Sequence, residues 1–296
     1  APLAYDVNVH RQVETTAVSL YGLLPFPYPP PFLLLLLPLG IPSFGVAFPL
    51  WVVVTWLFYV LASRRTSSPS FALAQPAVFL NEIQGQNGFL TCGIFLLAAS
   101  ALPTAPYLAG AIWGLLIIKP QLALLLPVAL IAGREWKAIA GGAFSAIAIS
   151  LLALLVLRVE AYKGFFHILP LYGQWMATSE WPWQKLASPF ALLRYFGVPQ
   201  STALIVHAEI ALAAAVVTWR AWARAIPERV PILAAATLLV SPYTLTYDSL
   251  LLLAPLAWLM KHKRQPYAVA VVWIMLLPVG LLNGPYHGPN TVPVAC

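Results

Sequence analysis

The stretch Asn81–Gly88 is the first part of the chain in which side chains able to do chemistry gather. Glu82, Gln86 and Asn87 offer one carboxylate and two amides, and the glycines of the stretch allow the backbone to turn tightly. Polar groups at this density are costly between apolar segments unless they find hydrogen-bond partners. The pattern predicts a hydrogen-bonding rim for a hydroxyl-rich or phosphate-bearing ligand. An ordinary polar loop is the alternative.

Lys119 is the second candidate, because no other residue between positions 106 and 132 carries a charge. Pro120 follows it, removes a backbone donor and interrupts a helix at this point, and Gln121 comes next. A compact ammonium at a helix break suits a phosphate oxygen. We therefore predict a phosphate-binding lysine with Gln121 beside it. A lysine that snorkels to the end of a membrane span is the alternative.

The third candidate is the polar break Ser241–Asp248, which again separates two apolar runs. Asp248 is a carboxylate within or beside the membrane, which makes it a candidate catalytic residue, with Tyr247 as a substrate-binding neighbour. An N-cap of the following helix is the other interpretation, and the two are compatible. His207 and Glu209 lie two residues apart and do not face each other on a helix. The sequence assigns neither of them a role.

The composition indicates what kind of protein positions these residues. Of 296 residues, 61% are hydrophobic and only 8% are charged, which leaves too little polar surface for a soluble enzyme. The net charge of +7 comes from short basic clusters between apolar stretches, which is typical of a polytopic membrane protein and not of a nucleic-acid-binding one. A Walker-type phosphate loop, a nucleophile elbow, HExxH and CxxC are all missing from the sequence.

The apolar segments predict an all-α, polytopic bundle. About nine or ten segments are expected, several of them too short to cross a bilayer alone, so broken or re-entrant helices should occur. The expected segments are 32–62 (divided near 42–44), 71–83, 88–102, 106–118, 121–132, 137–157, 201–223, 229–243, 247–260 and 266–282.

The basic residues predict which loops lie inside. Ten of the sixteen fall in four loops that alternation places in the cytoplasm. Those ten are Arg64, Arg65, Arg134, Lys137, Arg220, Arg224, Arg229, Lys261, Lys263 and Arg264. We expect residues 1–31 to be the remnant of a first external loop and 32–296 to form the transmembrane domain, with an external loop at 158–200. All three polar breaks then face outward.

Together these regions resemble glycosyltransferase family 87, of the GT-C class of polytopic membrane glycosyltransferases. No single motif is specific, but their order and spacing extend through most of the chain. The residues that carry the resemblance are Tyr28-Pro29-Pro30, Gly85-Gln86-Asn87, Gly114, Lys119-Pro120-Gln121, Gly133 to Trp136, Ser241-Pro242 and Tyr247-Asp248.

The resemblance implies transfer of a sugar, a mannose-like hexose or a pentose, from a polyprenyl-phosphate donor to a lipid or glycan acceptor. It implies that the reaction takes place at the outer, periplasmic face of the bacterial cytoplasmic membrane, among membrane lipids. Neither a nucleotide sugar nor a nucleic acid is an expected partner. Tyr28 becomes a substrate-binding candidate. The catalytic Asp of the family is expected upstream of Ala1, and Asp6 is not taken as its substitute. Tyr243 stands where many members have His.

For such a reaction Lys119 would contact the donor phosphate, while Gln86, Asn87 and Gln121 would hold sugar or phosphate oxygens. Tyr247 and Asp248 would line the acceptor side. No cofactor is required and the ligand inventory argues against a tetrahedral metal site, although a carboxylate-bound Mg²⁺ stays open. The rival hypotheses are a non-catalytic flippase or transporter of lipid-linked sugars and a degenerate scaffold homologue.

Overall fold

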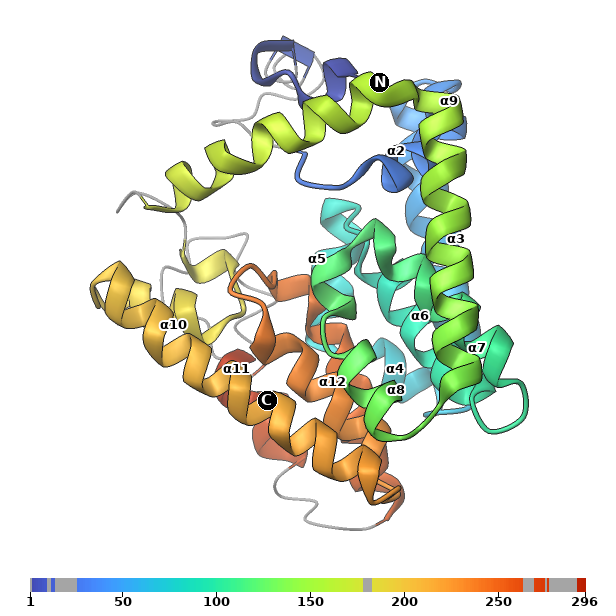
Figure 1. Cartoon of the computed structure of the whole chain (residues 1–296), viewed down its shortest axis with the longest axis vertical. Helices are drawn as coiled ribbons and strands as arrows, with labels where there is room; N and C mark the ends of the chain where they lie inside the picture. The colour runs from blue at the N-terminus through green and yellow to red at the C-terminus, as the bar shows by residue number, and fades with distance from the viewer. Residues whose placement is uncertain are drawn as a thin grey trace.

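The computed structural model describes residues 2–9, 12–13, 26–177, 183–262, 269–274, 276 and 292–296. It is 81% helical, and no strand occurs in these ranges, apart from an isolated β-bridge between Leu186 and Leu245. The predicted all-α membrane architecture is confirmed. Figure 1 shows the helices, with α9 along one side and α11 crossing the lower part of the view.

The first apolar stretch is divided as its prolines predict. After η1 (Pro2–Tyr5), α2 (Pro30–Leu36) continues into the 3₁₀ turn η2 (Leu37–Gly40), and α3 (Phe44–Ser63) begins after a break. Proline supplies no backbone donor, so the helix cannot continue unbroken through this interval. The result is a short helical piece followed by one full-length span.

The next elements are five short helices, four of which begin at proline or glycine, while the fifth has proline as its second residue. Proline is favoured in the first turn of a helix, because an N–H at that position has no acceptor within the helix and its absence costs no hydrogen bond. The elements are α4 (Pro69–Leu73), α5 (Pro76–Gln84), α6 (Gly88–Ala101), α7 (Pro106–Gly114) and α8 (Leu126–Ala132). Two 3₁₀ turns, η3 (Leu115–Ile118) and η4 (Pro120–Ala123), flank Lys119 between α7 and α8. The predicted break at Lys119-Pro120 is therefore present.

Helix α9 (Trp136–Ala177) is kinked at Arg158, whose φ is 64° and ψ 171°. The apolar segment predicted for 137–157 ends at this kink. The interval 158–200, expected as a loop, is instead mostly helical: α9 continues beyond Arg158 in a new direction across the top of Figure 1. The short elements η5 (Trp183–Lys185) and α10 (Pro189–Tyr195) follow.

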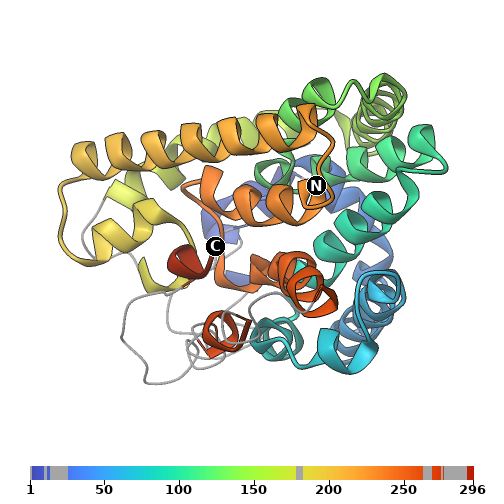
Figure 2. The same cartoon turned by 90° about the horizontal axis from the view of Figure 1, so that it is seen from below.

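The C-terminal elements close the bundle. They are α11 (Gln200–Ala223), α12 (Arg229–Val240), η6 (Thr246–Leu252), α13 (Leu253–Lys261) and α15 (Val292–Ala295). Residues 269–274 are helical, while the rest of the predicted segment 266–282, residue 276 excepted, lies outside the described residues. Seen from below, α11 runs along one edge of the molecule (Figure 2).

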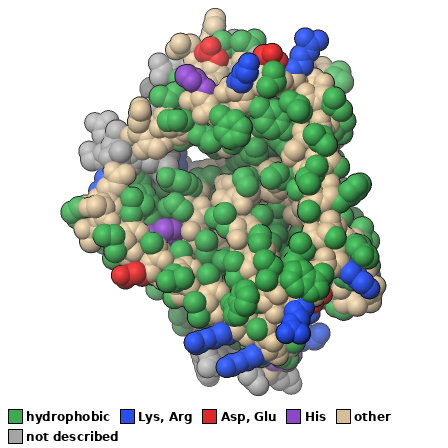
Figure 3. Space-filling view, in the orientation of Figure 1, with side chains coloured by type: hydrophobic (Ala, Val, Ile, Leu, Met, Phe, Trp, Pro, Cys, Tyr) green, Lys and Arg blue, Asp and Glu red, His purple; other side chains and the backbone are tan. Residues whose placement is uncertain are grey.

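Three described helices are long and apolar enough to cross a membrane: Phe44–Ser63, Trp136–Gln174 and Gln200–Ala223. Their apolar windows are only 11%, 11% and 22% buried within the protein, as expected for helices that face lipid. Hydrophobic side chains cover the middle of the molecule in Figure 3, and Lys and Arg gather toward its lower end. The interior is formed mainly by α6, η6 and the short helices around them.

Small residues let α7 and α9 approach closely. A Cβ placed on Gly110 would collide with the backbone carbonyl of Ala138. Helix pairs in membranes commonly pack through such small residues, because lipid tails leave little hydrophobic driving force for their association. This contact fixes α7, and therefore the Lys119 break that follows it, against the first half of α9.

Candidate functional site

A buried ammonium lies at the centre of the site. Lys119 is 0% exposed, and its Nζ donates to Asp248 Oδ1 at 2.6 Å and to Asn87 Oδ1 at 3.1 Å. These three residues come from the three polar breaks predicted from the sequence. A charge in such surroundings must be paired and hydrogen-bonded to be tolerated, and here it is both.

The local backbone explains how Lys119 reaches this position. Between η3 and η4 its φ is −146° and its ψ 72°, so the chain is not helical at this residue. Its backbone N–H donates to Leu116 O and its carbonyl accepts from Leu122 N, so both polar groups are satisfied within the break. Pro120 keeps the two 3₁₀ turns from joining into one helix.

Asp248 is held on two sides. Its Oδ1 accepts from Lys119, and its Oδ2 accepts from the backbone N–H of Leu245 at 3.2 Å, at the start of η6. The N-cap of η6 is Leu245, so Asp248 is not the N-cap expected from the sequence. It lies three residues later, where its carboxylate accepts from the N-cap N–H and also forms the ion pair. Because both carboxylate oxygens are engaged and the residue is 1% exposed, Asp248 is better placed to orient Lys119 than to accept a proton.

Two tyrosines cover the ammonium. The hydroxyls of Tyr28 and Tyr247 are hydrogen-bonded at 2.7 Å, and Lys119 Nζ lies 4.3 Å from the ring centroid of Tyr247 and 6.0 Å from that of Tyr28. Both distances are within the range of cation–π attraction. Burial raises the pKa of Tyr28 to about 12, so its phenol is neutral at physiological pH.

Asn81 and Gly88 bring α5 and α6 against η6. Asn81 Nδ2 donates to Ala77 O at 2.8 Å and to Tyr247 O at 3.2 Å. A Cβ on Gly88 would collide with the Asn81 amide and lie 2.8 Å from Tyr247 O, so only glycine permits this approach. Asn87, directly before Gly88, is thereby held next to Lys119.

An aromatic chain connects the N-terminal residues to the site. Ring contacts run from Tyr5 through Phe26, Tyr28 and Phe32 to Trp51, with centroid separations of 4.7 to 6.0 Å. Tyr5 also donates to Tyr28 O at 2.8 Å, which fixes the backbone beneath the Tyr28 ring. The position of Tyr28 therefore depends on residues far from it in the sequence.

Among the described residues, no hydrogen bond joins the predicted site residues Gln86, Gln121 and Glu82 to this cluster. Gln86 is half-buried and donates to Gln84 Oε1 at 3.3 Å, and Gln121 is also half-buried. Glu82 lines a separate cavity to which Asn87, Lys119, Tyr247 and Asp248 do not contribute. Asp6 is exposed and accepts from the backbone of Asn8 and Val9, as a local turn requires.

Two residues that the sequence left without a role also lie outside the cluster. His207 is 5% exposed, with Nε2 3.1 Å from Val240 O and its ring against Phe190, so it joins α11 to α10 and α12. Glu209 is exposed on α11. Among the described residues no group of three or more His, Cys, Asp or Glu could hold a metal ion.

The residue that sequence reasoning missed is Gln75. It is 2% exposed, and neither its Nε2 nor its Oε1 has a hydrogen-bond partner among the described residues. In the sequence it stands before Pro76 and has the form of an ordinary helix-start residue. No local signal distinguishes it, because its burial depends on how α5 packs.

Lys119 still has one hydrogen-bond donor for a ligand in this arrangement. An ammonium has three N–H donors, and Asn87 and Asp248 accept two of them. The third can serve a ligand oxygen while the other two keep the group in place. In a low-dielectric site such a preorganised cation strongly stabilises developing negative charge.

A sequence profile of glycosyltransferase family 87 matches residues 26–242, which is most of the chain. The chain belongs to this family. The family assignment expected from the sequence is confirmed, and the protein is a membrane glycosyltransferase by family. The matched range of this family 87 protein includes Tyr28, Asn87 and Lys119 and ends shortly before Tyr247 and Asp248. No curated protein and no solved structure shows significant similarity to the chain.

Proposed function

We propose that this family 87 protein transfers a sugar, a mannose-like hexose or a pentose, from a polyprenyl-phosphate donor to a lipid or glycan acceptor. The observation that carries the proposal is the Lys119 ammonium. It is fully buried, held by Asn87 and Asp248, and lies where three breaks in apolar segments meet. A fixed cation enclosed among apolar helices suits a phosphate that arrives on a lipid.

The reaction needs charge stabilisation more than acid catalysis. The bond between the anomeric carbon and the phosphate oxygen breaks, and a bond to the acceptor hydroxyl oxygen forms. The phosphate leaves as a stable anion, and Lys119 donates its remaining hydrogen bond to that anion. The proton of the acceptor hydroxyl goes to a carboxylate that acts as general base.

We assign Asp248 a positioning role in this scheme. Its contacts with Lys119 and with the Leu245 N–H keep the ammonium aimed and leave no free carboxylate oxygen for proton transfer. Tyr28 and Tyr247 enclose the cation and would contact the sugar or phosphate. Gln86 and Gln121, both half-buried, are available to bind sugar oxygens at the margin of the site.

The outer face of the cytoplasmic membrane is the proposed location of the reaction. The four predicted inside loops carry ten basic residues, and the end of the molecule where Lys and Arg gather is visible in Figure 3. In the predicted topology, the Asn81–Asn87 turn and the Lys119 break lie on the opposite, outer side of the membrane. The donor would then enter from the outer leaflet.

The test is transfer in proteoliposomes with a synthetic polyprenyl-phosphate mannose and no nucleotide. We expect product from the wild-type protein and a loss of at least about 100-fold for Lys119→Ala, as for removal of a charge-stabilising donor. Lys163→Ala, which changes an exposed lysine of α9, is the matched control and should be unaffected.

Near-normal turnover of Lys119→Ala would remove the lysine from the mechanism. Movement of a fluorescent lipid-linked sugar across the bilayer without product would favour the transporter hypothesis, which the discontinuous helices around Lys119 also suit.

A further inference from the structure

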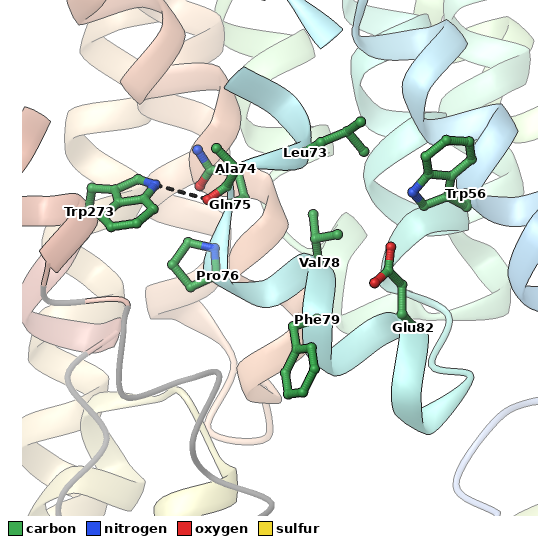
Figure 4. A pocket seen from close by; sticks show the side chains of 9 residues that line it. All are labelled: Trp56, Leu73, Ala74, Gln75, Pro76, Val78, Phe79, Glu82 and Trp273. Atoms are coloured by element: carbon green, nitrogen blue, oxygen red, sulfur yellow. Dashed lines mark hydrogen bonds between the residues drawn. The ribbon is translucent and has the colours of Figure 1, made fainter. Parts of the chain in front are cut away.

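The Lys119 cluster does not account for every feature of the described chain. One feature outside it is the cavity beside α5, which Trp56, Glu82 and Trp273 help to line (Figure 4). Another is the second half of α9, residues 159–177, which was expected as a loop and is helical instead. The exposed side chains of this helix divide into an apolar and a polar set, and that division indicates what the helix contacts.

The first half of α9 is long enough to cross a membrane by itself. Residues 136–157 form about 33 Å of helix at a rise of 1.5 Å per residue, and the hydrocarbon core of a bilayer is about 30 Å thick. The apolar window of α9 is only 11% buried, as expected for a span that faces lipid. The chain then bends at Arg158, and Glu160 and Lys163 follow within two turns. The second half of α9 therefore begins where the span leaves the hydrocarbon.

One side of the second half of α9 is packed against the N-terminal residues. Ala161 and Ile168 are 0% and 3% exposed and belong to a cluster that also contains Tyr5. The ring of Phe165 lies 5.8 Å from that of Tyr5, and a Cβ on Gly164 would lie 3.2 Å from the same Tyr5 ring. These contacts fix the rotation of the helix about its own axis, so the remaining side chains have defined directions.

The exposed side of the same helix is divided along its length. Residues three, four or seven positions apart lie on one side of a helix. The first such set is apolar and exposed: Val159 (45%), Phe166 (63%) and Leu169 (40%). The second set is polar and exposed: Glu160, Lys163 and His167. The helix thus has an apolar edge and a polar edge beside its buried side, which is the pattern of an amphipathic helix at a membrane interface.

The apolar edge faces the membrane-spanning half of α9. Tyr162 lies on this edge, four residues before Phe166 and seven before Leu169. Its hydroxyl donates to the carbonyl of Ser150, within the first half of α9, at 2.8 Å. The edge is therefore turned back toward the span, and the polar edge is turned away from it. Figure 3 agrees, because charged and His side chains lie along its upper end and hydrophobic ones lie below them.

Lipid explains this arrangement better than water or a protein partner does. Single exposed apolar residues need no explanation, but here they share one edge, and that edge faces the span. The apolar edge continues the exposed apolar surface of the span, so the lipid that covers the one also covers the other. The polar edge would be costly within hydrocarbon and is satisfied among headgroups and water.

We propose that the second half of α9 lies in the membrane interface, with its apolar edge against the acyl chains and its polar edge among headgroups and water. Helices of this kind bury their apolar side about 5–10 Å into the boundary between headgroups and acyl chains. The partner is the lipid surface itself. Because Phe165 packs on Tyr5, and Tyr5 donates to Tyr28 O, the anchored helix also fixes the depth of Tyr28 in the membrane. The proposal does not depend on sugar transfer.

Spin labels on neighbouring residues test the proposal. Phe166→Cys and His167→Cys carry a nitroxide label in the full chain, reconstituted in vesicles of phosphatidylcholine and phosphatidylglycerol. Oxygen concentrates in hydrocarbon, whereas a water-soluble nickel complex stays outside it, so the ratio of the two collision rates reports depth. We expect this ratio to be at least about threefold higher at Phe166→Cys than at His167→Cys, because the two lie on different edges. Both side chains are exposed, so neither change removes buried packing.

Other positions show whether the difference follows the two edges. Leu169→Cys should give a ratio close to that of Phe166→Cys, and Lys163→Cys should give one close to that of His167→Cys. Ile147→Cys, at a position that is 58% exposed in the first half of α9, is the reference for a label in hydrocarbon.

The native cysteines require one change. Cys92 is 1% exposed and should take up no label, while Cys296 is half-buried, so every variant also carries Cys296→Ser. Protein with Cys296→Ser alone is the unlabelled control.

Equal ratios at Phe166→Cys and His167→Cys overturn the proposal. Equally low ratios would mean that this part of α9 lies in water, and equally high ratios would mean that it lies within the hydrocarbon. A difference of the opposite sign would mean that the polar edge faces the membrane, and this result also overturns the proposal. The readout is the position of a label, so failure here is distinguishable from absence of sugar transfer.

Discussion

Lys119 and Asp248 are 129 residues apart in sequence, and their side chains meet at 2.6 Å with neither exposed to solvent. The ion pair joins the break between η3 and η4 to the start of η6. Each charge alone would be expensive at membrane depth, and each makes the other tolerable. The pair therefore couples the stability of the fold to the charge of the candidate site.

Removing one partner should cost far more stability than removing both. Lys119→Met leaves Asp248 buried and unpaired, and we expect a loss of about 3–5 kcal/mol in the free energy of unfolding. Lys119→Met combined with Asp248→Leu should recover most of this loss, because apolar replacement of a buried pair is often neutral. Unfolding in mild detergent measures both variants, and sugar transfer should be absent from both. A double variant as unstable as the single one would contradict the pairing.

The hydroxyl pair of Tyr28 and Tyr247 gives a second test. Either Tyr→Phe change alone leaves the other hydroxyl without its partner at 2.7 Å and should destabilise the protein by about 1–3 kcal/mol. The double Phe variant removes both hydroxyls and should be closer to wild type than the sum of the single changes. A double-mutant cycle of unfolding free energies measures the coupling. Simple additivity would show that the two hydroxyls do not interact.

The breaks in the apolar segments were predictable because their causes are local. Pro120 removes a helical donor, and Gly85 ends α5 with a φ of 60°, so the sequence alone indicates where polar groups enter the bundle. The meeting of Asn87, Lys119 and Asp248 followed from a simple requirement. Isolated polar groups among apolar helices must find one another.

Other features depend on packing and were not predictable. Glu82 belongs to the same polar stretch as Asn87, but α5 turns it toward a different cavity. Gln75 carries no sequence signal at all, since its burial arises only when α5 packs. The residues beyond Arg158 were expected to form a loop because they are more polar than those before the kink. Hydropathy does not distinguish a polar helix from a polar loop, and here the chain is helical.

Gly88 should tolerate no side chain. Gly88→Ala places a Cβ against the Asn81 amide and Tyr247 O, so we expect a loss of about 1–3 kcal/mol from overpacking and a drop in transfer activity. Gly45→Ala is the matched control, because nothing lies within 4 Å of its added Cβ in α3. That change should be neutral or stabilising through helix propensity. Equal melting temperatures for the two variants would show that α6 does not approach η6 this closely.

Arg158 makes the kink of α9 a site of backbone strain. Its φ of 64° with a ψ of 171° lies in a region that only glycine adopts at low cost. Arg158→Gly should therefore stabilise the protein by about 1–3 kcal/mol, while Arg158→Ala, which has the same side-chain loss without the freedom at φ, should bring no such gain. Thermal unfolding of both variants measures the difference. Equal stabilities would mean that α9 does not bend at this residue, and that the helix beyond it continues in the direction of the first half.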